Sequence, residues 1–360
     1  MATPLSPDPN QLAAAWQQLA AANTRLRIRD AADTLGVSEA QLLATQVGGQ
    51  AVRLLATDWK EVVAALPGLG EAMALTRNEA AVIEKVGTYA SPSFMGQVGQ
   101  VVGPHIDLRL FMQHWAHGYA CQLPIHGQMT SSLQFFDAQG NALHKVYARQ
   151  PEHQAAWQAL VDRFRHPQQA RSLQPAAAPP PVPARPDAEV EAEALLAGWA
   201  QLQDTHDFFQ LLRAHGVGRL QALRIAQGRF AFPITPEGFY QAATGAADQA
   251  VPVMFFVGNP GVIAIHTGPI RRIVPMEGWF NVMDPGFNLH LRTDLVAQAW
   301  LVLKPTQDGL VTSIELYDAQ EALILQMFGT RKPGHAELAE WRRLVQQATQ
   351  HTFSYPNPVN

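Results

Sequence analysis

The chain carries one sequence pattern twice, and an internal repeat restricts the fold more than any other feature of a sequence. Phe136-Asp137-Ala138-Gln139 returns as Tyr317-Asp318-Ala319-Gln320. The segments 104–110 and 285–291, upstream of the two copies, share a proline and two leucines at matching positions. A helix carrying a tryptophan is expected downstream of each copy. The chain is therefore predicted to fold as two structurally similar halves, which need not share one function.

The composition is that of an ordinary globular protein. With 360 residues the chain can bury two cores, and its content is 47% hydrophobic and 16% charged. The formal net charge is -4. Nucleic acids and anionic membranes select basic surfaces, so neither is expected to be a stable partner of this chain.

The cysteine content and the N-terminus both bear on the compartment. Cys121 is the single cysteine, which excludes an intrachain disulfide and a cysteine-rich metal site. Residues 1–9 lack the basic start and apolar run of a secretory signal, and no stretch has the apolar length of a membrane span. We therefore expect a cytoplasmic location.

A proline- and alanine-rich segment separates the two halves. Residues 176–186 contain repeated prolines, which fix the backbone φ angle and remove hydrogen-bond donors. We predict an N-terminal repeat over 1–165, an extended linker over 166–186 and a C-terminal repeat over 187–360.

Both halves have the same order of elements, with helices first, then many short strands, then a closing helix. The strands alternate in hydrophobicity and are separated by turn residues, so they are expected to pair with sequence neighbours. This order predicts an α+β fold of two tandem structural repeats, each a large antiparallel β-sheet with flanking helices. The predicted helices are 10–22, 27–35, 39–45, 58–66, 187–202, 204–214 and 335–350, and the predicted strands fall within 81–147 (including 108–115, 131–136 and 142–147) and 251–328.

The segment 27–45 resembles a helix-turn-helix, which makes a DNA-binding regulator a distant alternative. Ser38 and Gln41 form a capping box at the start of its second helix. That helix, however, carries the acid Glu39 and no base, whereas DNA readers contact phosphates with basic side chains. An ordinary helical pair is the favoured interpretation.

His206 is the most interesting of the histidines. His114 and His117 are three residues apart in a predicted strand, so they would face opposite sides of a sheet and not share a metal. His206 follows Asp204 and Thr205, either of which can cap the next helix, and precedes Phe208 and Phe209. An imidazole beside an apolar cleft there can ligate heme iron, but on the residues alone a surface or capping role is the favoured interpretation.

Cations are frequent among the predicted strands and turns of the second half. A surface position is the ordinary role for each of them. If several converge on one cleft, they suit a planar anionic ligand with carboxylates, because guanidinium pairs with carboxylate in a bidentate geometry. The candidates are Arg219, Arg271, Arg272, Arg292, Lys304, Arg331 and Lys332.

Taken together, several segments resemble the HemS/ChuS/HmuS/PhuS family of cytoplasmic heme-trafficking or hemin-degrading proteins. The resemblance covers almost the whole chain except the proline-rich linker. The segments that carry it are 106–111, 204–209, 255–261, 265–269, 287–292 and 328–334.

The resemblance implies a binding site for heme b on the C-terminal repeat. His206 matches the axial ligand of the heme iron, and Arg109 matches a distal arginine contributed by the first half. Phe328 stands where the family has tyrosine, which removes a hydroxyl donor. The other matching positions are Phe111 and Phe256 as apolar walls, Lys304, Arg331 and Arg219 near the propionates, and Gln326 in the pocket.

The resemblance also implies two roles that these residues serve equally. One is a heme carrier that accepts heme from an inner-membrane importer and delivers it to a downstream heme oxygenase. The other is an enzyme that degrades heme oxidatively, with Arg109 as the catalytic residue. Trp59 is aligned with His206 in the first repeat, which predicts one primary heme per chain.

Overall fold

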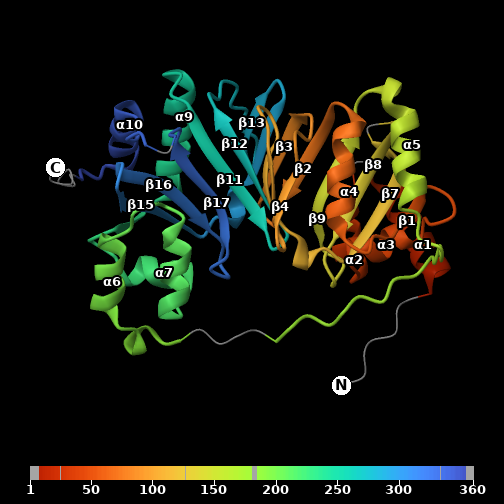
Figure 1. Cartoon of the computed structure of the whole chain (residues 1–360), viewed down its shortest axis with the longest axis horizontal. Coiled ribbons are helices and arrows are strands. Elements are labelled where there is room, and N and C mark those ends of the chain that lie inside the picture. The colour runs from red at the N-terminus through yellow and green to blue at the C-terminus, as the bar shows by residue number, and fades with distance from the viewer. Residues whose placement is uncertain (1–7, 25, 126, 181–184, 333, 354–360) are drawn as a thin grey trace. The chain divides into compact units, whose positions relative to one another are not determined.

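A computed structural model describes residues 8–24, 26–125, 127–180, 185–332 and 334–353 (Figure 1). The chain divides into two compact units, called unit 1 and unit 2 below. Unit 1 comprises 1–77, 83–180 and 258–264, and unit 2 comprises 78–82, 181–257 and 265–360. Both combine helices with antiparallel sheet, which confirms the predicted α+β class.

The two units repeat one order of hydrogen-bonded strands. In unit 1 the order is β1-β7-β8-β9-β2, and in unit 2 it is β10-β15-β16-β17-β11, with every pair antiparallel. The bounds are β1 Ala51–Leu54, β2 Ala72–Arg77, β7 His117–Ile125, β8 Gln128–Phe136, β9 Ala142–Ala148, β10 Ala231–Ile234, β11 Val253–Asn259, β15 Gln298–Thr306, β16 Gly309–Tyr317 and β17 Leu323–Gly329.

The sequence copies that reveal the repeat form one turn twice. Asp137 follows β8, and its Oδ1 accepts from the backbone N–H of Gln139 at 3.0 Å and of Asn141 at 2.8 Å. Asp318 follows β16, and its Oδ1 accepts from the backbone N–H groups two and four residues ahead at 2.9 and 2.8 Å. An aspartate at this place stabilises the turn because its side chain accepts from backbone N–H groups of the following residues, which explains why it occurs in both copies.

The other strands are shorter or lie outside the shared order. The predicted strand 108–115 ends at Phe111, because residues 112–114 form a 3-10 turn. His114 therefore lies in that turn while His117 begins β7, and the prediction that both occupy one strand is wrong. The remaining bounds are β3 Ala81–Gly87, β4 Ser93–Met95, β5 Val98–Val102, β6 Asp107–Phe111, β12 Val262–Gly268, β13 Trp279–Asp284 and β14 Phe287–Arg292.

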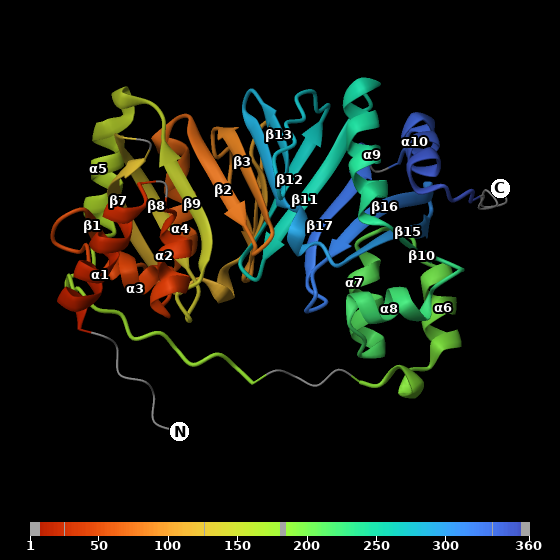
Figure 2. The ribbon, with the colours of Figure 1, turned by 180° about the vertical axis from the view of Figure 1, so that it is seen from behind.

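The first three helices of unit 1 pack together (Figure 2). The predicted capping box is confirmed: Ser38 N–H donates to Gln41 Oε1 at 2.9 Å, and Gln41 N–H donates to Ser38 Oγ at 3.3 Å. Glu39 is buried and accepts from Lys145 Nζ at 2.8 Å and from Arg77. The helices are α1 Pro9–Ala22, α2 Ile28–Leu35, α3 Glu39–Ala44, α4 Trp59–Ala65 and α5 Gln154–Arg163.

The burial of α3 bears on the DNA-binding alternative. Apart from Gln41, every residue of α3 is buried. A recognition helix must present side chains to the major groove, whereas α3 presents its side chains to the core of unit 1. The segment 27–45 is an ordinary pair of packed helices.

Unit 2 has helices on both faces of its sheet. They are α6 Ala192–Ala200, α7 Asp207–His215, α8 Arg219–Ile225, α9 Pro236–Asp248 and α10 Ala339–Thr349. The predicted helices 187–202 and 204–214 begin later than expected, and α8 and α9 have no counterpart in the prediction. Gly238 and Gly245 lower the intrinsic helical propensity of α9, but tertiary packing of its buried residues overrides that propensity and stabilises the helix.

The helices α6, α7 and α8 cover one face of this sheet. Trp199 of α6 stacks on Phe230 with ring centroids 5.6 Å apart and donates from Nε1 to Leu303 O at 2.9 Å. Trp300 and Val302 of β15 belong to the same buried cluster. Since alternate residues of a strand share a face, Lys304 points to this same side.

The opposite face of the sheet packs against α9 and α10, which lie side by side in Figures 1 and 2. Trp341 of α10 is fully buried and donates from Nε1 to Thr312 Oγ1 at 2.9 Å. A Cβ at Gly329 would lie 2.4 Å from Trp341 Cγ, so the close approach requires glycine.

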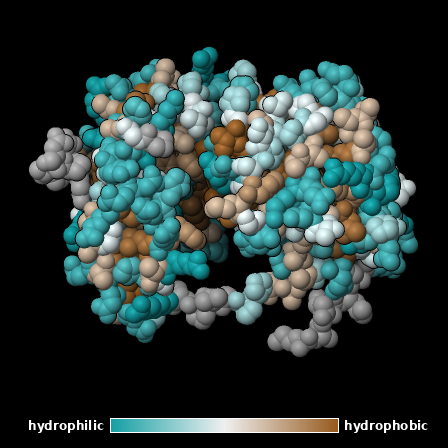
Figure 3. Space-filling view, in the orientation of Figure 1, coloured by the Kyte–Doolittle hydropathy of each residue, from teal (hydrophilic) through white to brown (hydrophobic). Residues whose placement is uncertain are grey.

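The linker and the surface complete the description. Residues 176–180, 185 and 186 form neither helix nor strand, while 181–184 lie outside the described residues, so the boundaries at 166–186 stay a prediction. The face drawn in Figure 3 is mostly hydrophilic, with scattered apolar patches. Among the described residues, no helix has both the length and the apolar character of a membrane span.

Candidate functional site

Four side chains that were predicted to belong to the site, and the carboxylate of Glu315, share one face of the unit 2 sheet. The strand register places Glu315 opposite Gln326, and Gln326 opposite Phe256. Phe328 lies two residues along β17 from Gln326, and Lys304 shares this face through the alternation of β15. Residues from four strands, β15, β16, β17 and β11, thus converge under α7 and α8.

The carboxylate of Glu315 is fully buried at the centre of this face. Arg219, the first residue of α8, donates to it from Nε at 2.7 Å and from Nη2 at 2.6 Å. Lys304 donates from Nζ at 3.2 Å. Further donors are Tyr317 Oη at 2.7 Å, Gln326 Nε2 at 2.9 Å and Ser313 Oγ at 3.3 Å. One carboxylate therefore ties α8 to three strands.

The charges of this network stabilise one another. Burial raises the pKa of Glu315, but Arg219 and Lys304 outweigh that effect and hold the pKa well below its usual range. Burial lowers the pKa of Lys304 to about 8, although Glu315 opposes the shift. Arg219 and Lys304 are thus engaged with a protein carboxylate, and Lys304 is only 2% exposed.

Aromatic rings line the same region. The Lys304 ammonium lies 5.0 Å from the ring centroid of Phe208 and 5.6 Å from that of Phe328. Phe328 and Phe256 make an edge-to-face contact with centroids 5.3 Å apart. The network therefore combines apolar rings with buried cations, and the cation–π contacts add to the ion pair with Glu315.

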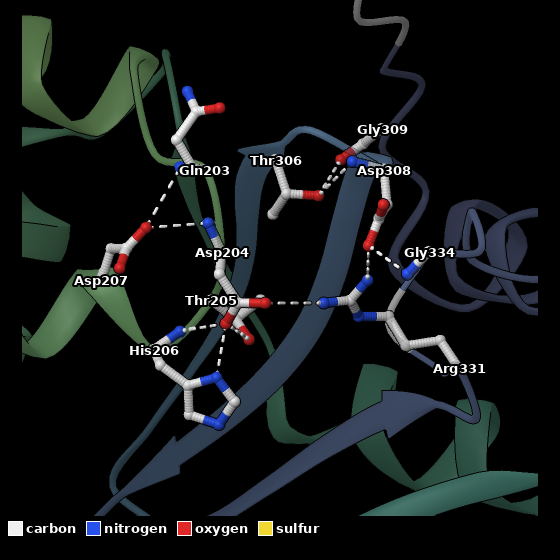
Figure 4. A network of polar contacts seen from close by, with 10 residues as sticks. All are labelled: Gln203, Asp204, Thr205, His206, Asp207, Thr306, Asp308, Gly309, Arg331 and Gly334. Atoms are coloured by element: carbon white, nitrogen blue, oxygen red, sulfur yellow. Dashed lines mark hydrogen bonds and ion pairs between the residues drawn. The ribbon is translucent and has the colours of Figure 1, made fainter.

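His206 lies at the N-terminal end of α7, with its side chain 91% exposed. Asp204 Oδ1 accepts from the backbone N–H of His206 at 2.8 Å and also contacts imidazole Nδ1 (Figure 4). A carboxylate only accepts hydrogen bonds, so the neutral imidazole carries its proton on Nδ1 and its lone pair on Nε2. The arrangement presents an accessible imidazole nitrogen that can bind a metal.

The surroundings of His206 differ from the expected cleft. Phe208 is buried in the helical core, 4.4 Å from Trp199 between ring centroids, so it does not line a cleft beside the imidazole. Phe209 is 70% exposed. Successive helix residues point in different directions, which is why one aromatic enters the core and its neighbour faces solvent.

Arg331, expected near the propionates, is held by two carboxylates. It is 11% exposed, and its nearest partners are Asp308 Oδ2, 3.2 Å from Nη1, and Asp204 Oδ2, 3.6 Å from Nη2 (Figure 4). Arg331 is thereby linked through Asp204 to His206. The other predicted cations, Lys304 and Arg219, are linked to Glu315 instead.

In unit 1, Arg109 and Phe111 lie on β6. The register of β5 and β6 pairs Arg109 with Gln100 and Phe111 with Val98, so these four side chains share a face. Arg109 contacts Asp107 through Nη1, which also donates to Leu108 O at 3.2 Å. Val98 is exposed, and the face therefore joins a guanidinium to accessible apolar groups.

The acidic partners of these residues were not predicted from the sequence. Glu315 lies in an apolar strand, and an acid at such a position is the pattern that could have revealed a buried ion pair. Asp308 lies in a turn, where a surface aspartate is common. Asp204 was expected to cap a helix but not to contact the imidazole.

The alignment of Trp59 with His206 is wrong. The order α2-α3-β1-α4 in unit 1 matches α7-α8-β10-α9 in unit 2, and both α2 and α7 end in a left-handed glycine, Gly36 and Gly216. Trp59 in α4 therefore corresponds to α9. The residue before α2 is Arg27 where His206 precedes α7. That one primary heme binds per chain stays a prediction.

Comparison with known proteins gives the same architecture. The haemin-degrading HemS.ChuX domain matches the chain twice, at residues 36–164 and 216–348. The chain belongs to the HemS/ChuX family. Its two matches cover the two repeats seen in the strand order.

Several full-length relatives are similar to this chain. The hemin transport protein HmuS of Yersinia pestis is 38% identical over 88% of this chain and 91% of its own length. The structure of holo-PhuS, a heme-binding protein from Pseudomonas aeruginosa, is 44% identical with a TM-score of 0.91, covering 94% of this chain and 99% of that one. The heme degrading enzyme ChuS of Escherichia coli O157:H7 is 34% identical with a TM-score of 0.88 and the same coverage.

Proposed function

We propose that this chain is a cytoplasmic heme-binding protein of a bacterial heme-uptake system, which accepts imported heme through His206 and delivers it for iron release. The observation that carries the proposal is the exposed imidazole whose Nδ1 is engaged by Asp204. Relatives described as transporting or binding heme support it. The free, buried Cys121 suits a reducing compartment.

The chemistry of the residues fits heme. Heme requires a neutral nitrogen for the iron, apolar contacts for the macrocycle and complementary charge for two propionates. His206 offers the nitrogen, and exposed Phe209 offers apolar surface on the same helix. The proposed pocket residues of unit 2 are Phe256, Phe328, Gln326 and the cations Lys304, Arg331 and Arg219. In unit 1, Arg109 and Phe111 are proposed to contact heme.

Titration of ferric heme into the purified chain tests the iron ligand. The wild type is expected to give a saturable absorption spectrum with one histidine-ligated heme per chain. His206→Ala is expected to change the axial ligation and weaken retention of heme. His215→Ala, at the other end of α7, is the matched control and should behave as the wild type. An unchanged spectrum in His206→Ala would remove His206 as the ligand.

Oxidative heme degradation is the second candidate function. The relative described as a heme degrading enzyme and the accessible position of Arg109 on β6 favour it. Heme itself supplies the oxygen chemistry in such reactions, while protein groups orient the reactants. Arg109 would then be the catalytic residue.

Two measurements separate the functions. The heme complex is given a reductant and O2 with catalase present, and the Soret absorption is followed. Stoichiometric loss with a tetrapyrrole product, slowed in Arg109→Gln, supports the enzyme. Intact heme that transfers to a downstream heme oxygenase supports the carrier. The proposed heme donor, an inner-membrane importer, is tested by following heme transfer from the purified importer to the heme-free chain.

A further inference from the structure

The loop that carries His206 is fixed on both sides. Asp207 Oδ2 accepts from the backbone N–H of Asp204 at 2.9 Å and of Gln203 at 3.2 Å. The backbone N–H of Gln307 donates to Gln203 O at 3.1 Å. Since Gln307 lies in the turn between β15 and β16, the loop before α7 is attached to the sheet of unit 2.

Within this loop, Asp204 reaches both the ligand histidine and a cation. Its Oδ1 accepts from the backbone and from Nδ1 of His206, while Oδ2 faces Arg331 Nη2 (Figure 4). Both carboxylate oxygens are thus occupied by protein groups. The carboxylate cannot rotate away from the imidazole without losing the contact with Arg331.

Arg331 is itself held in place. Asp308 Oδ2 lies 3.2 Å from Arg331 Nη1 and also accepts from the backbone N–H of Gly334 at 3.0 Å. The backbone N–H of Asp308 donates to Thr306 Oγ1 at 3.3 Å, and that hydroxyl donates to Gly309 O at 2.7 Å. A continuous set of contacts therefore runs from the β15–β16 turn through Arg331 and Asp204 to His206.

We propose that Asp204 is a positioning residue for the iron-binding imidazole and that Arg331 acts on heme through Asp204. A carboxylate that accepts from Nδ1 fixes the tautomer and orientation of the ring and raises the basicity of Nε2. The guanidinium draws charge from that carboxylate and limits the effect. The inference rests on the proposed function, in which His206 binds heme iron.

Two substitutions should shift the iron–histidine stretching frequency in opposite directions, which distinguishes this role from simple loss of structure. Asp204→Asn removes the charge but keeps the size and an acceptor, so the iron–histidine stretching frequency of the ferrous heme complex should fall. Arg331→Gln leaves Asp204 more basic, so the same frequency should rise. In the double variant Arg331→Gln should add no shift, because the group through which it acts is gone.

The control is Asp248→Asn, which removes an equal charge from an exposed position at the end of α9, on the opposite side of the unit 2 sheet from His206. Transfer of heme to excess apomyoglobin measures release. Asp204→Asn should release heme roughly 10- to 100-fold faster than the wild type, because loss of a residue that orients a metal-binding histidine lowers metal affinity by about that factor. Asp248→Asn should leave the stretching frequency unchanged.

Heme dimethyl ester tests whether Arg331 acts through the propionates, because the ester lacks their charge. The shift caused by Arg331→Gln should persist with the ester. An Arg331 effect seen only with free-acid heme would overturn the role through Asp204. Equal frequencies and release rates in Asp204→Asn and wild type would overturn the positioning role while His206 remained the ligand. Failure of the wild type to bind heme, or an unaltered His206→Ala spectrum, would overturn the proposed function and this inference with it.

Discussion

Arg219 and Glu315 form a bidentate ion pair with donor–acceptor distances of 2.7 and 2.6 Å. Arg219 is the first residue of α8, and the equivalent first residue of α3 in unit 1 is Glu39. Glu39 pairs with Lys145 on β9 at 2.8 Å. The two repeats therefore tie a helix to the sheet in the same way, with acid and base exchanged.

The strand register shows how the exchange is accommodated. In unit 1, Lys145 lies opposite Gln134, whereas in unit 2 Gln326 lies opposite Glu315. Each pair of neighbouring positions holds one charged side chain and one glutamine. Buried charges are tolerated only with partners, so the helix residue and the sheet residue must change sign together.

Glu315→Gln should destabilise unit 2 by about 3–5 kcal/mol, because it leaves Arg219 and Lys304 without their carboxylate. Urea unfolding followed by tryptophan fluorescence measures the loss. Glu321→Gln is the matched control, since Glu321 pairs with Arg224 at 2.8 Å on the surface, and should cost less than about 1 kcal/mol. Equal losses in the two variants would contradict the role of Glu315.

Acid should unfold the protein in part through His144. This buried residue contacts Tyr89 Oη at 2.7 Å and Thr76 Oγ1 at 2.9 Å, and burial lowers its pKa from 6.5 to about 3. Below its unfolded pKa the unfolded chain binds a proton that the folded chain excludes. The free energy of unfolding should therefore fall by about 1.4 kcal/mol per pH unit as the pH decreases from 6.5, the unfolded pKa, to about 3, the folded pKa.

Unfolding of His144→Gln across the same pH range measures that contribution. The variant lacks the titrating ring, so its stability should depend less steeply on pH than that of the wild type. His335→Gln, at an exposed position, is the control. An identical pH dependence in wild type and His144→Gln would argue against this source of acid sensitivity.

Gly329→Ala should destabilise unit 2, because the added methyl group would lie 2.4 Å from Cγ of the buried Trp341. Overpacking of this kind typically costs about 1–3 kcal/mol. Thermal unfolding measures the effect. Gly68→Ala, where no heavy atom lies within 4 Å of the added carbon, is the control and should unfold near the wild-type temperature.

Phe328→Tyr should slow the release of heme, because it restores the hydroxyl donor that relatives are expected to carry near Lys304. One additional hydrogen bond is worth about 1 kcal/mol, which corresponds to roughly a fivefold slower release. Transfer to apomyoglobin measures the rate. Phe232→Tyr on β10 is a control for adding a phenol, and equal rates in both variants would count against a pocket role for Phe328.

Local features of the fold were predictable from the sequence because their causes are local. The turn at Asp137 and its copy at Asp318 depend on one side chain and the next few backbone groups. The capping box of Ser38 and Gln41 is likewise complete within four residues. Helices α8 and α9 were missed, since packing of their buried residues outweighs the glycines in α9.

The candidate site shows the same division. His206 stood out because it follows Asp204 and Thr205, two residue types that often cap helices, although in the structure His206 itself precedes the first residue of α7. The cations Lys304 and Arg219 also stood out, but their partner Glu315 did not. Arg219 and Glu315 are 96 positions apart, and no local pattern brings them together.

The sequence by itself determined the repeat, the α+β class and which residues are able to bind a metal or an anionic ligand. It could do so because periodicity and turn chemistry act over a few neighbouring positions. Tertiary structure decided what those residues contact. It buried Lys304 against Glu315, left His206 in solvent and brought Arg331 to Asp204. The reason is physical: the strength of a charge interaction depends on distance and burial, and both are set only when distant segments pack together.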